Sequence, residues 1–225
     1  MPVKPIESDQ DPRYGEILQM SQKLLEMVRI LCNAFRKQDR TSLAAADRLG
    51  REVHRHEKTL MSTLVTVADV EMRPPSDEIT VFIPMHLERA GDNLESLAGS
   101  VRTMIAEGIL FTDRATREVD SLLEMTEELL ECVHDAVRTR NRALIRNILM
   151  VSKQCEYMAN EYALFHEQRL IEGVCQPRAS SLYLAMFDYL KGVEWHVRQI
   201  AEKLAPAPLS TLELVHRAHE PAKPA

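Results

Sequence analysis

Three carboxylate side chains at helical spacing are the first candidates for chemistry in this sequence. Glu88 and Asp92 are four residues apart, and Glu95 follows three residues later. On a helix, side chains at these positions project from one face. Like charges at this spacing repel one another weakly, and a divalent cation that bridges their oxygens reverses the repulsion. A solvated acidic face has the same spacing, so the spacing alone leaves both interpretations open.

Further metal ligands would have to come from a neighbouring helix. His54 and Glu57 offer an imidazole and a carboxylate three residues apart, a pair of ligand types that suits a divalent metal. Both residue types are common on protein surfaces, so this pair is the weaker candidate.

A second metal pattern, E-x-x-H, occurs at Glu131 and His134. Di-iron carboxylate bundles require a second E-x-x-H on another helix of the bundle and two further glutamates. The other E-x-x-H, Glu213 to His216, lies near the C-terminal end of the sequence. We therefore do not expect a di-iron oxidase.

Six helices are predicted to carry these residues. Glycines number only seven and aromatic residues make up 5% of the 225-residue chain, a composition that favours helices over sheets. Between the helix-breaking residues, apolar side chains recur at intervals of three and four. Thr112 and Asp113, which follow Gly108, offer a capping oxygen and an acid for a helix start near residue 112.

An internal repeat relates the two halves of the sequence. The segment AFRKQDR from Ala34 matches AVRTRNR from Ala136, and HLERAGDNLESLA from His86 aligns with YLKGVEWHVRQIA from Tyr189. The offsets are 136 − 34 = 102 and 189 − 86 = 103 residues. The fold expected is therefore all-α, with two tandem three-helix bundles. We place an N-terminal extension at 1–13, the bundles at 14–108 and 112–205, and a mobile, proline-rich tail at 206–225.

Composition narrows the possible partners and compartment. The net charge is −6 and no basic cluster interleaved with aromatic residues occurs, so we expect no nucleic-acid partner. No apolar run approaches the roughly 20 residues that cross a bilayer, and the N-terminal segment lacks a signal-like apolar region. We expect a cytoplasmic protein that meets a membrane only through a partner. Cys32, Cys132 and Cys155 fall in helical patterns and are expected to be reduced packing residues.

Two motifs resemble those of the PhoU family. The string LERAGD at 87–92, followed by LESLA, resembles the family signature LERIGDxxxNIA with its E-x-x-x-D carboxylate pair. In the second repeat, HEQRLIEG at 166–173 resembles the H-x-x-R-L-x-x-G of PhoU-type domains that accompany sodium-phosphate cotransporters, through His166, Arg169, Leu170 and Gly173. The resemblance extends over nearly the whole chain, as far as Leu204.

The resemblance implies an adaptor and not an enzyme. PhoU-like proteins act with a phosphate transporter component and a sensor histidine kinase to repress phosphate-starvation genes, and they carry metal clusters. The metal implied here is iron, zinc, magnesium or another divalent ion at Glu88, Asp92 and Glu95. In the second repeat the family glutamate falls on Lys191 and the family aspartate on Trp195, so we expect any metal on the first repeat only.

Trp195 and Lys191 form a candidate partner-binding site instead of a metal site. On a helical projection of 100° per residue, Trp195 falls on the outer face of its helix. An exposed tryptophan is typical of an interface anchor. Packing under the tail would also account for it. A homodimer is one of the assemblies that such a contact would support.

Two other functions remain open. One is an accessory subunit of a sodium-phosphate or Pit-type carrier, which the HEQRLIEG match favours. The other is a metal-dependent enzyme that uses the Glu88 and Asp92 face, and a buried pocket beside those residues would support it.

Overall fold

The computed structural model describes residues 12–67 and 75–205, and across these ranges it is helical without any strand. The helices are α1 (Pro12–Lys37), α2 (Leu43–Val67), α3 (Pro75–Ala106), α4 (Asp113–Thr139), α5 (Arg142–Ile171) and α6 (Pro177–Leu204). The all-α prediction is confirmed. Residues 12 and 13 of the predicted extension at 1–13 belong to α1, and the rest of it lies outside the described residues, as does the tail at 206–225.

Helix ends follow the signals in the sequence. Thr112 caps α4 as predicted, because its hydroxyl accepts a hydrogen bond from the backbone N–H of Ala115 at 3.2 Å. At the other ends, Gln38 follows α1 with φ 51° and Arg140 follows α4 with φ 54°. Both lie in the left-handed region that terminates helices. Their separation, 140 − 38 = 102, equals the offset of the sequence repeat.

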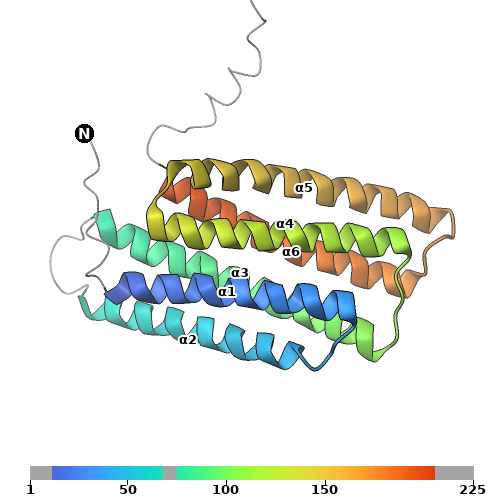
Figure 1. Ribbon diagram of the computed structural model, residues 1–225, viewed down its shortest axis with the longest axis horizontal. Helices are drawn as coiled ribbons and strands as arrows, with labels where there is room; N and C mark the ends of the chain where they lie inside the picture. The colour runs from blue at the N-terminus through green and yellow to red at the C-terminus, as the bar shows by residue number, and fades with distance from the viewer. Residues whose placement is uncertain (1–11, 68–74, 206–225) are drawn as a thin grey trace, which may run out of the picture.

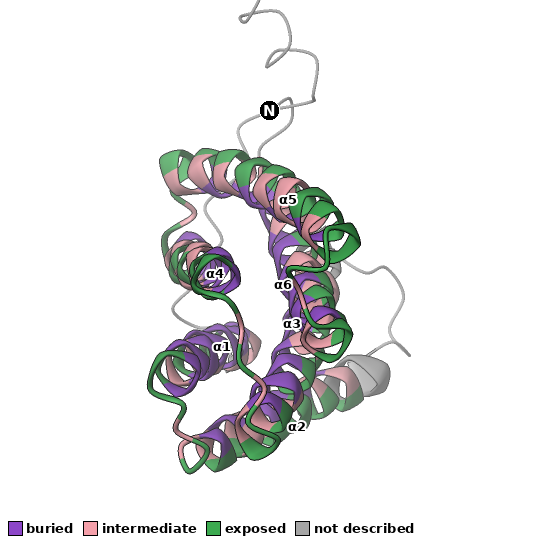
Figure 2. Cartoon of the chain, turned by 90° about the vertical axis from the view of Figure 1, so that its right-hand side faces the viewer, coloured by how far each residue is buried: buried purple, intermediate pink, exposed green. Residues whose placement is uncertain are grey.

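Two three-helix bundles lie side by side (Figure 1). Helices α1, α2 and α3 contact one another, and so do α4, α5 and α6. The two bundles meet where α1 contacts α4 and α3 contacts α6. Viewed from one end, the four inner helices form the centre of the molecule, with α2 and α5 at its opposite edges (Figure 2). The outer faces of α2 and α5 are therefore open to solvent.

Burial repeats along the chain in step with the sequence. Most buried positions of α2 recur 102 residues later in α5, and most of those of α3 recur 103 residues later in α6. The pairs are Leu43 with Ile145, Ala46 with Ile148, Gly50 with Ser152, Val53 with Cys155, Leu87 with Leu190, Ala90 with Val193, Gly91 with Glu194 and Leu94 with Val197. One apolar core runs through all six helices. Along α3 and α6, the apolar residues that recur at intervals of three and four face this core.

Ion pairs line the contact between α1 and α4. Each of two arginines on α1 binds two acids that lie four residues apart on α4. The pairs are Arg29 with Glu127 (2.9 Å) and Glu131 (3.2 Å), and Arg36 with Asp120 and Glu124 (both 2.6 Å). These partly exposed contacts flank the apolar seam between the two bundles and add only modestly to its stability.

The cysteines are free thiols, as expected for Cys32, Cys132 and Cys155. Burial raises the pKa of Cys32 and of Cys155 to about 12, so both remain protonated packing residues. None of the six described helices has an apolar stretch of the length that crosses a membrane.

Candidate functional site

A surface groove between α2 and α3 collects most of the predicted metal ligands. Its cavity has a volume of about 550 Å³. We call it the α2–α3 groove, and its lining residues are Gly50, Arg51, Val53, His54, Arg55, Glu88, Gly91, Asp92 and Glu95. Glu57 is not among them, so the structure brings together four of the five predicted ligands.

Two close approaches set the positions of the acids in the α2–α3 groove. Nδ1 of His54 lies 3.3 Å from Oε1 of Glu88, which joins the two helices across the groove. Glu95 lies over Gly50, where a Cβ atom would come within 2.0 Å of its Oε1. Glycine at this position therefore makes room for the Glu95 carboxylate. Sequence analysis found the acids but not the glycine that admits one of them.

Basic residues balance the acids of the groove. Arg89 lies between Glu88 and Asp92, with nitrogen to oxygen distances of 3.6 and 3.4 Å. Partial burial, together with the negative charges of Asp92 and Asp47, raises the pKa of Glu95 above its ordinary value. Arg51 and Arg55 add positive charge from α2. The basic residues that α2 contributes can be predicted from the sequence, because residues 51, 54 and 55 share one face of a helix.

The donor types of the α2–α3 groove suit a divalent ion, but their arrangement does not form a complete ligand set. Carboxylates and an imidazole are ordinary ligands for such ions. Within residues 12–67 and 75–205, however, no three His, Cys, Asp or Glu side chains are placed to hold one. Arg89 instead neutralises Glu88 and Asp92, so this arrangement fits a polar binding surface better than a metal centre.

The equivalent position between α5 and α6 is filled by side chains. Glu194 replaces Gly91 there, since 194 − 91 = 103, and its side chain is buried. Arg198 lies 3.1 Å from Glu194 and 3.6 Å from Glu156 of α5. Lys191 lies 3.5 Å from Asn160. At these positions the second repeat therefore has the charged pair Glu194 and Arg198 where the first repeat has Gly91 and Glu95.

Comparison with solved structures finds the same helical arrangement. PhoU from Pseudomonas aeruginosa matches with a TM-score of 0.76 and 18% identity, over 86% of this chain and 93% of that one. A PhoU-like protein from Shewanella oneidensis matches with a TM-score of 0.53 and 8% identity, over 85% and 94%. The chain has a PhoU-like fold. No family model and no curated protein matches the sequence.

On this PhoU-like fold, Trp195 lies at the seam between α3 and α6. Its ring is 45% exposed and packs against His86 of α3 and His196 of α6, at centroid distances of 5.7 and 4.8 Å. Nδ1 of His86 lies 2.9 Å from Nδ1 of His196. Burial lowers the pKa of His86, and burial together with His86 and Arg89 lowers that of His196 to about 4. The outer-face prediction therefore missed the contact that the ring makes with α3.

Two residues of the HEQRLIEG motif, His166 and Arg169, face the interior of the second bundle, whereas the rest of the motif is exposed. Arg169 donates two hydrogen bonds to Glu118 of α4, at 3.1 and 2.7 Å, and Tyr183 donates a third at 2.5 Å. The His166 ring stacks on Tyr183 at 4.3 Å. Burial would raise the pKa of Glu118, but hydrogen bonds from Arg169, Tyr183 and Arg114 outweigh it and hold the pKa below its ordinary value. His166 and Arg169 therefore have a structural role.

Proposed function

We propose that this protein is a cytoplasmic regulator of phosphate transport and phosphate-starvation signalling. In this proposal it acts without catalysis, as an adaptor between a phosphate transporter component and a sensor histidine kinase. The observation that carries the proposal is the position of the LERAGD segment in the solvent-open α2–α3 groove of a PhoU-like fold. A surface of paired charges suits reversible protein binding, because such charges guide association and specificity.

A reporter of phosphate-starvation genes tests the proposal in the source organism. Deletion of the gene is expected to raise reporter expression in phosphate-rich medium, and the full chain supplied in trans is expected to restore repression. Glu88→Arg with Asp92→Arg reverses the charge of the groove and is expected to abolish that restoration. Glu128→Arg changes an exposed acid of α4, outside both proposed contact sites, and is the control. Repression that is unaffected by the deletion would contradict the proposed function.

The alternatives receive less support from the geometry. An enzyme at Glu88 and Asp92 would be favoured by a buried pocket, but Asp92 and Glu95 are exposed in an open groove. The carrier-accessory interpretation depended on HEQRLIEG, and within that motif the bonds from Arg169 to Glu118 give Arg169 a role in stability. We therefore keep the adaptor as the proposed function.

Metal content is the second testable property of the groove. We propose that any divalent ion taken up by the protein binds at Glu88, Asp92 and Glu95 and not between α5 and α6, where Arg198 fills the equivalent position. Glu88→Gln with Asp92→Asn is expected to lower the metal content, measured by mass spectrometry after saturation with manganese or zinc, at least tenfold. If the double variant binds as much metal as the parent, the groove is not the metal site.

Trp195 and Lys191 are proposed as a contact for the partner. Trp195→Ala is expected to weaken capture of the phosphate transporter or kinase, since a half-exposed tryptophan loses apolar area when it is truncated. Because the ring also packs on His86, thermal unfolding should be measured on the same variant. Trp195→Phe keeps most of that packing and is the control. Unchanged capture by Trp195→Ala would leave the contact without support.

A further inference from the structure

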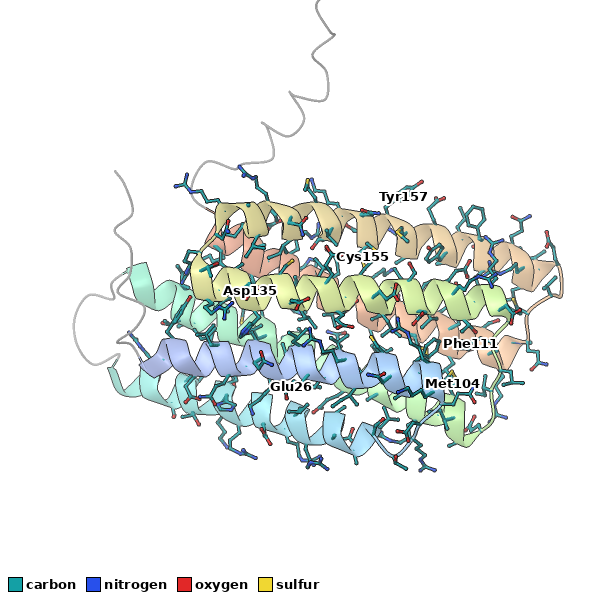
Figure 3. All side chains as sticks on the ribbon, in the orientation of Figure 1. Glu26, Met104, Phe111, Asp135, Cys155 and Tyr157 are labelled. Carbon is teal, nitrogen blue, oxygen red and sulfur yellow. The ribbon has the colours of Figure 1, made fainter. Side chains whose placement is uncertain are left out.

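A small cavity lies at one end of the molecule, between the α3–α4 connection and the α5–α6 connection. Its volume is about 170 Å³, and Phe111, one of its lining residues, marks this end in Figure 3. We call it the end cavity. Cys175 of the α5–α6 connection and His166 of α5 also line it. A thiol and an imidazole therefore border a space that is large enough for a small reactant.

His166 brings an unsatisfied polar group to the end cavity. The residue is 2% exposed, and its Nε2 has no hydrogen-bond partner. Its Nδ1 lies 3.5 Å from Nη2 of Arg169 and 3.9 Å from Sγ of Cys175. Burial and the charge of Arg169 lower the pKa of His166, so its ring is neutral. Because a guanidinium only donates hydrogen bonds, Nδ1 is the acceptor and Nε2 carries the proton. The imidazole is thus a buried donor that the protein alone leaves without an acceptor.

Positive charge surrounds the Cys175 thiol. The Arg169 guanidinium interacts with its sulfur. Arg169 and Arg114 both pair with Glu118, so one positive charge is left in excess. Cys175 also directly precedes Gln176, the N-cap of α6, whose side chain makes no capping hydrogen bond. Cations and the partial positive charge of a helix N-terminus favour the thiolate, which is the nucleophilic form of a cysteine.

The other three cysteines lack this setting. Cys32 and Cys155 are buried, whereas Cys132 is half-buried like Cys175. The charges around Cys132 are negative, and burial together with three acids raises its pKa. These acids are Glu128, Glu131 and Asp135. Exposure alone would make Cys132 and Cys175 equal, so the charge around each thiol decides which one reacts.

We propose that Cys175 is a site of reversible oxidation by hydrogen peroxide that enters the end cavity. The thiolate sulfur attacks one peroxide oxygen, so that an S–O bond forms as the O–O bond breaks. The sulfur loses two electrons and becomes a sulfenic acid, and the other oxygen leaves as hydroxide and takes up a proton to form water. A thiol reductant reverses the change, because two of its thiols become a disulfide and the sulfenic oxygen leaves as water. This inference goes beyond the proposed function and does not depend on it.

Mass spectrometry of peptides from the full chain tests the proposal. The folded protein is treated with hydrogen peroxide in the presence of dimedone, which traps sulfenic acids. Cys175 is expected to be labelled about tenfold faster than Cys132, or more. After peroxide alone, dithiothreitol is expected to restore a thiol at Cys175 that iodoacetamide alkylates. Equal labelling of Cys132 and Cys175, no labelling of Cys175, or a thiol that dithiothreitol does not restore would overturn the proposal.

Gln176→Glu tests whether charge causes the reactivity of Cys175. It places a carboxylate next to the thiol at an exposed position, where an acid also suits the start of α6. Oxidation of Cys175 is therefore expected to slow about threefold or more without loss of folding. Gln154→Glu adds the same charge at an exposed position of α5, 166 − 154 = 12 residues or about 18 Å before His166, and is the matched control. An unchanged rate in Gln176→Glu, or equal slowing in both variants, would contradict the role of charge.

Discussion

Glu118→Ala is expected to lower the free energy of unfolding by about 3 to 5 kcal/mol, the largest effect of a single substitution that we predict. Removing the carboxylate leaves the Arg169 guanidinium, which is 11% exposed, without the partner that accepts two of its hydrogen bonds. Tyr183 loses the acceptor of its hydroxyl at the same time. An isolated charge in this interior costs far more than the pair gains in the folded protein. Urea unfolding followed by circular dichroism measures the loss.

The other repeat supplies a matched control for Glu118. Glu16 lies 102 residues earlier and pairs with His56 at the surface, where its side chain is 33% exposed. Glu16→Ala is expected to cost less than about 1 kcal/mol, as for other exposed ion pairs. Arg169→Met introduced into the Glu118→Ala background should recover part of the stability, because it removes the unpaired charge. Equal losses at Glu16 and Glu118 would refute the proposed role of burial.

Much of this fold can be predicted from the sequence, because the two halves of the chain repeat the same three-helix pattern. The residues that end α1 and α4 repeat at 102, and Thr112 caps α4 where the sequence placed a helix start. Periodicity identified the faces of α3 and α6 that pack inward, since apolar stripes are set by local spacing. The ends and the apolar faces of helices depend on residues within one or two turns of the same helix.

What the sequence did not disclose depends on contacts between distant helices. Arg169 stood out as part of a motif, but its partner Glu118 is 51 residues away, and no local pattern links them. Trp195 was assigned to an outer face because the position of α3 beside its ring is a tertiary property. The acids of the α2–α3 groove were found by their spacing, whereas the approach of Glu95 to Gly50 required the helix packing itself.

Glu194, like Glu118, is a charged residue whose burial the periodicity of the sequence did not predict. It adjoins the apolar seam of α6 and is 1% exposed, facing Ser152 and Cys155 of α5. Nε of Arg198 lies 3.1 Å from its Oε1 but off the direction of a hydrogen bond. Burial raises the pKa of Glu194 to about 7, since Arg198 compensates only in part and Glu156 adds a like charge. The folded protein therefore holds a proton that the unfolded chain releases.

Stability is accordingly expected to depend on pH through Glu194. A carboxyl group with a raised folded-state pKa contributes stability that is fully present below its unfolded pKa of about 4.5, and that contribution is lost as the pH rises through about 7. Across this window the loss amounts to roughly 2 to 3 kcal/mol. Glu194→Gln keeps the shape of the side chain without its charge, so we expect it to be more stable than the parent by about that amount at pH 8. At pH 5 the two proteins should differ by less than about 1 kcal/mol.

Denaturant unfolding of both proteins at several pH values between 5 and 8 measures this difference. Glu167→Gln changes an exposed acid of α5, about three turns beyond Cys155, and it should leave the pH dependence of the parent unchanged. Because Arg198 keeps Glu156 as a partner, neutralising Glu194 does not leave that guanidinium without an acid. The decisive quantity is the slope of the unfolding free energy against pH. Glu194 contributes to this slope because its pKa differs between the folded and the unfolded state. If Glu194→Gln retains the full slope of the parent, the buried proton is not on Glu194.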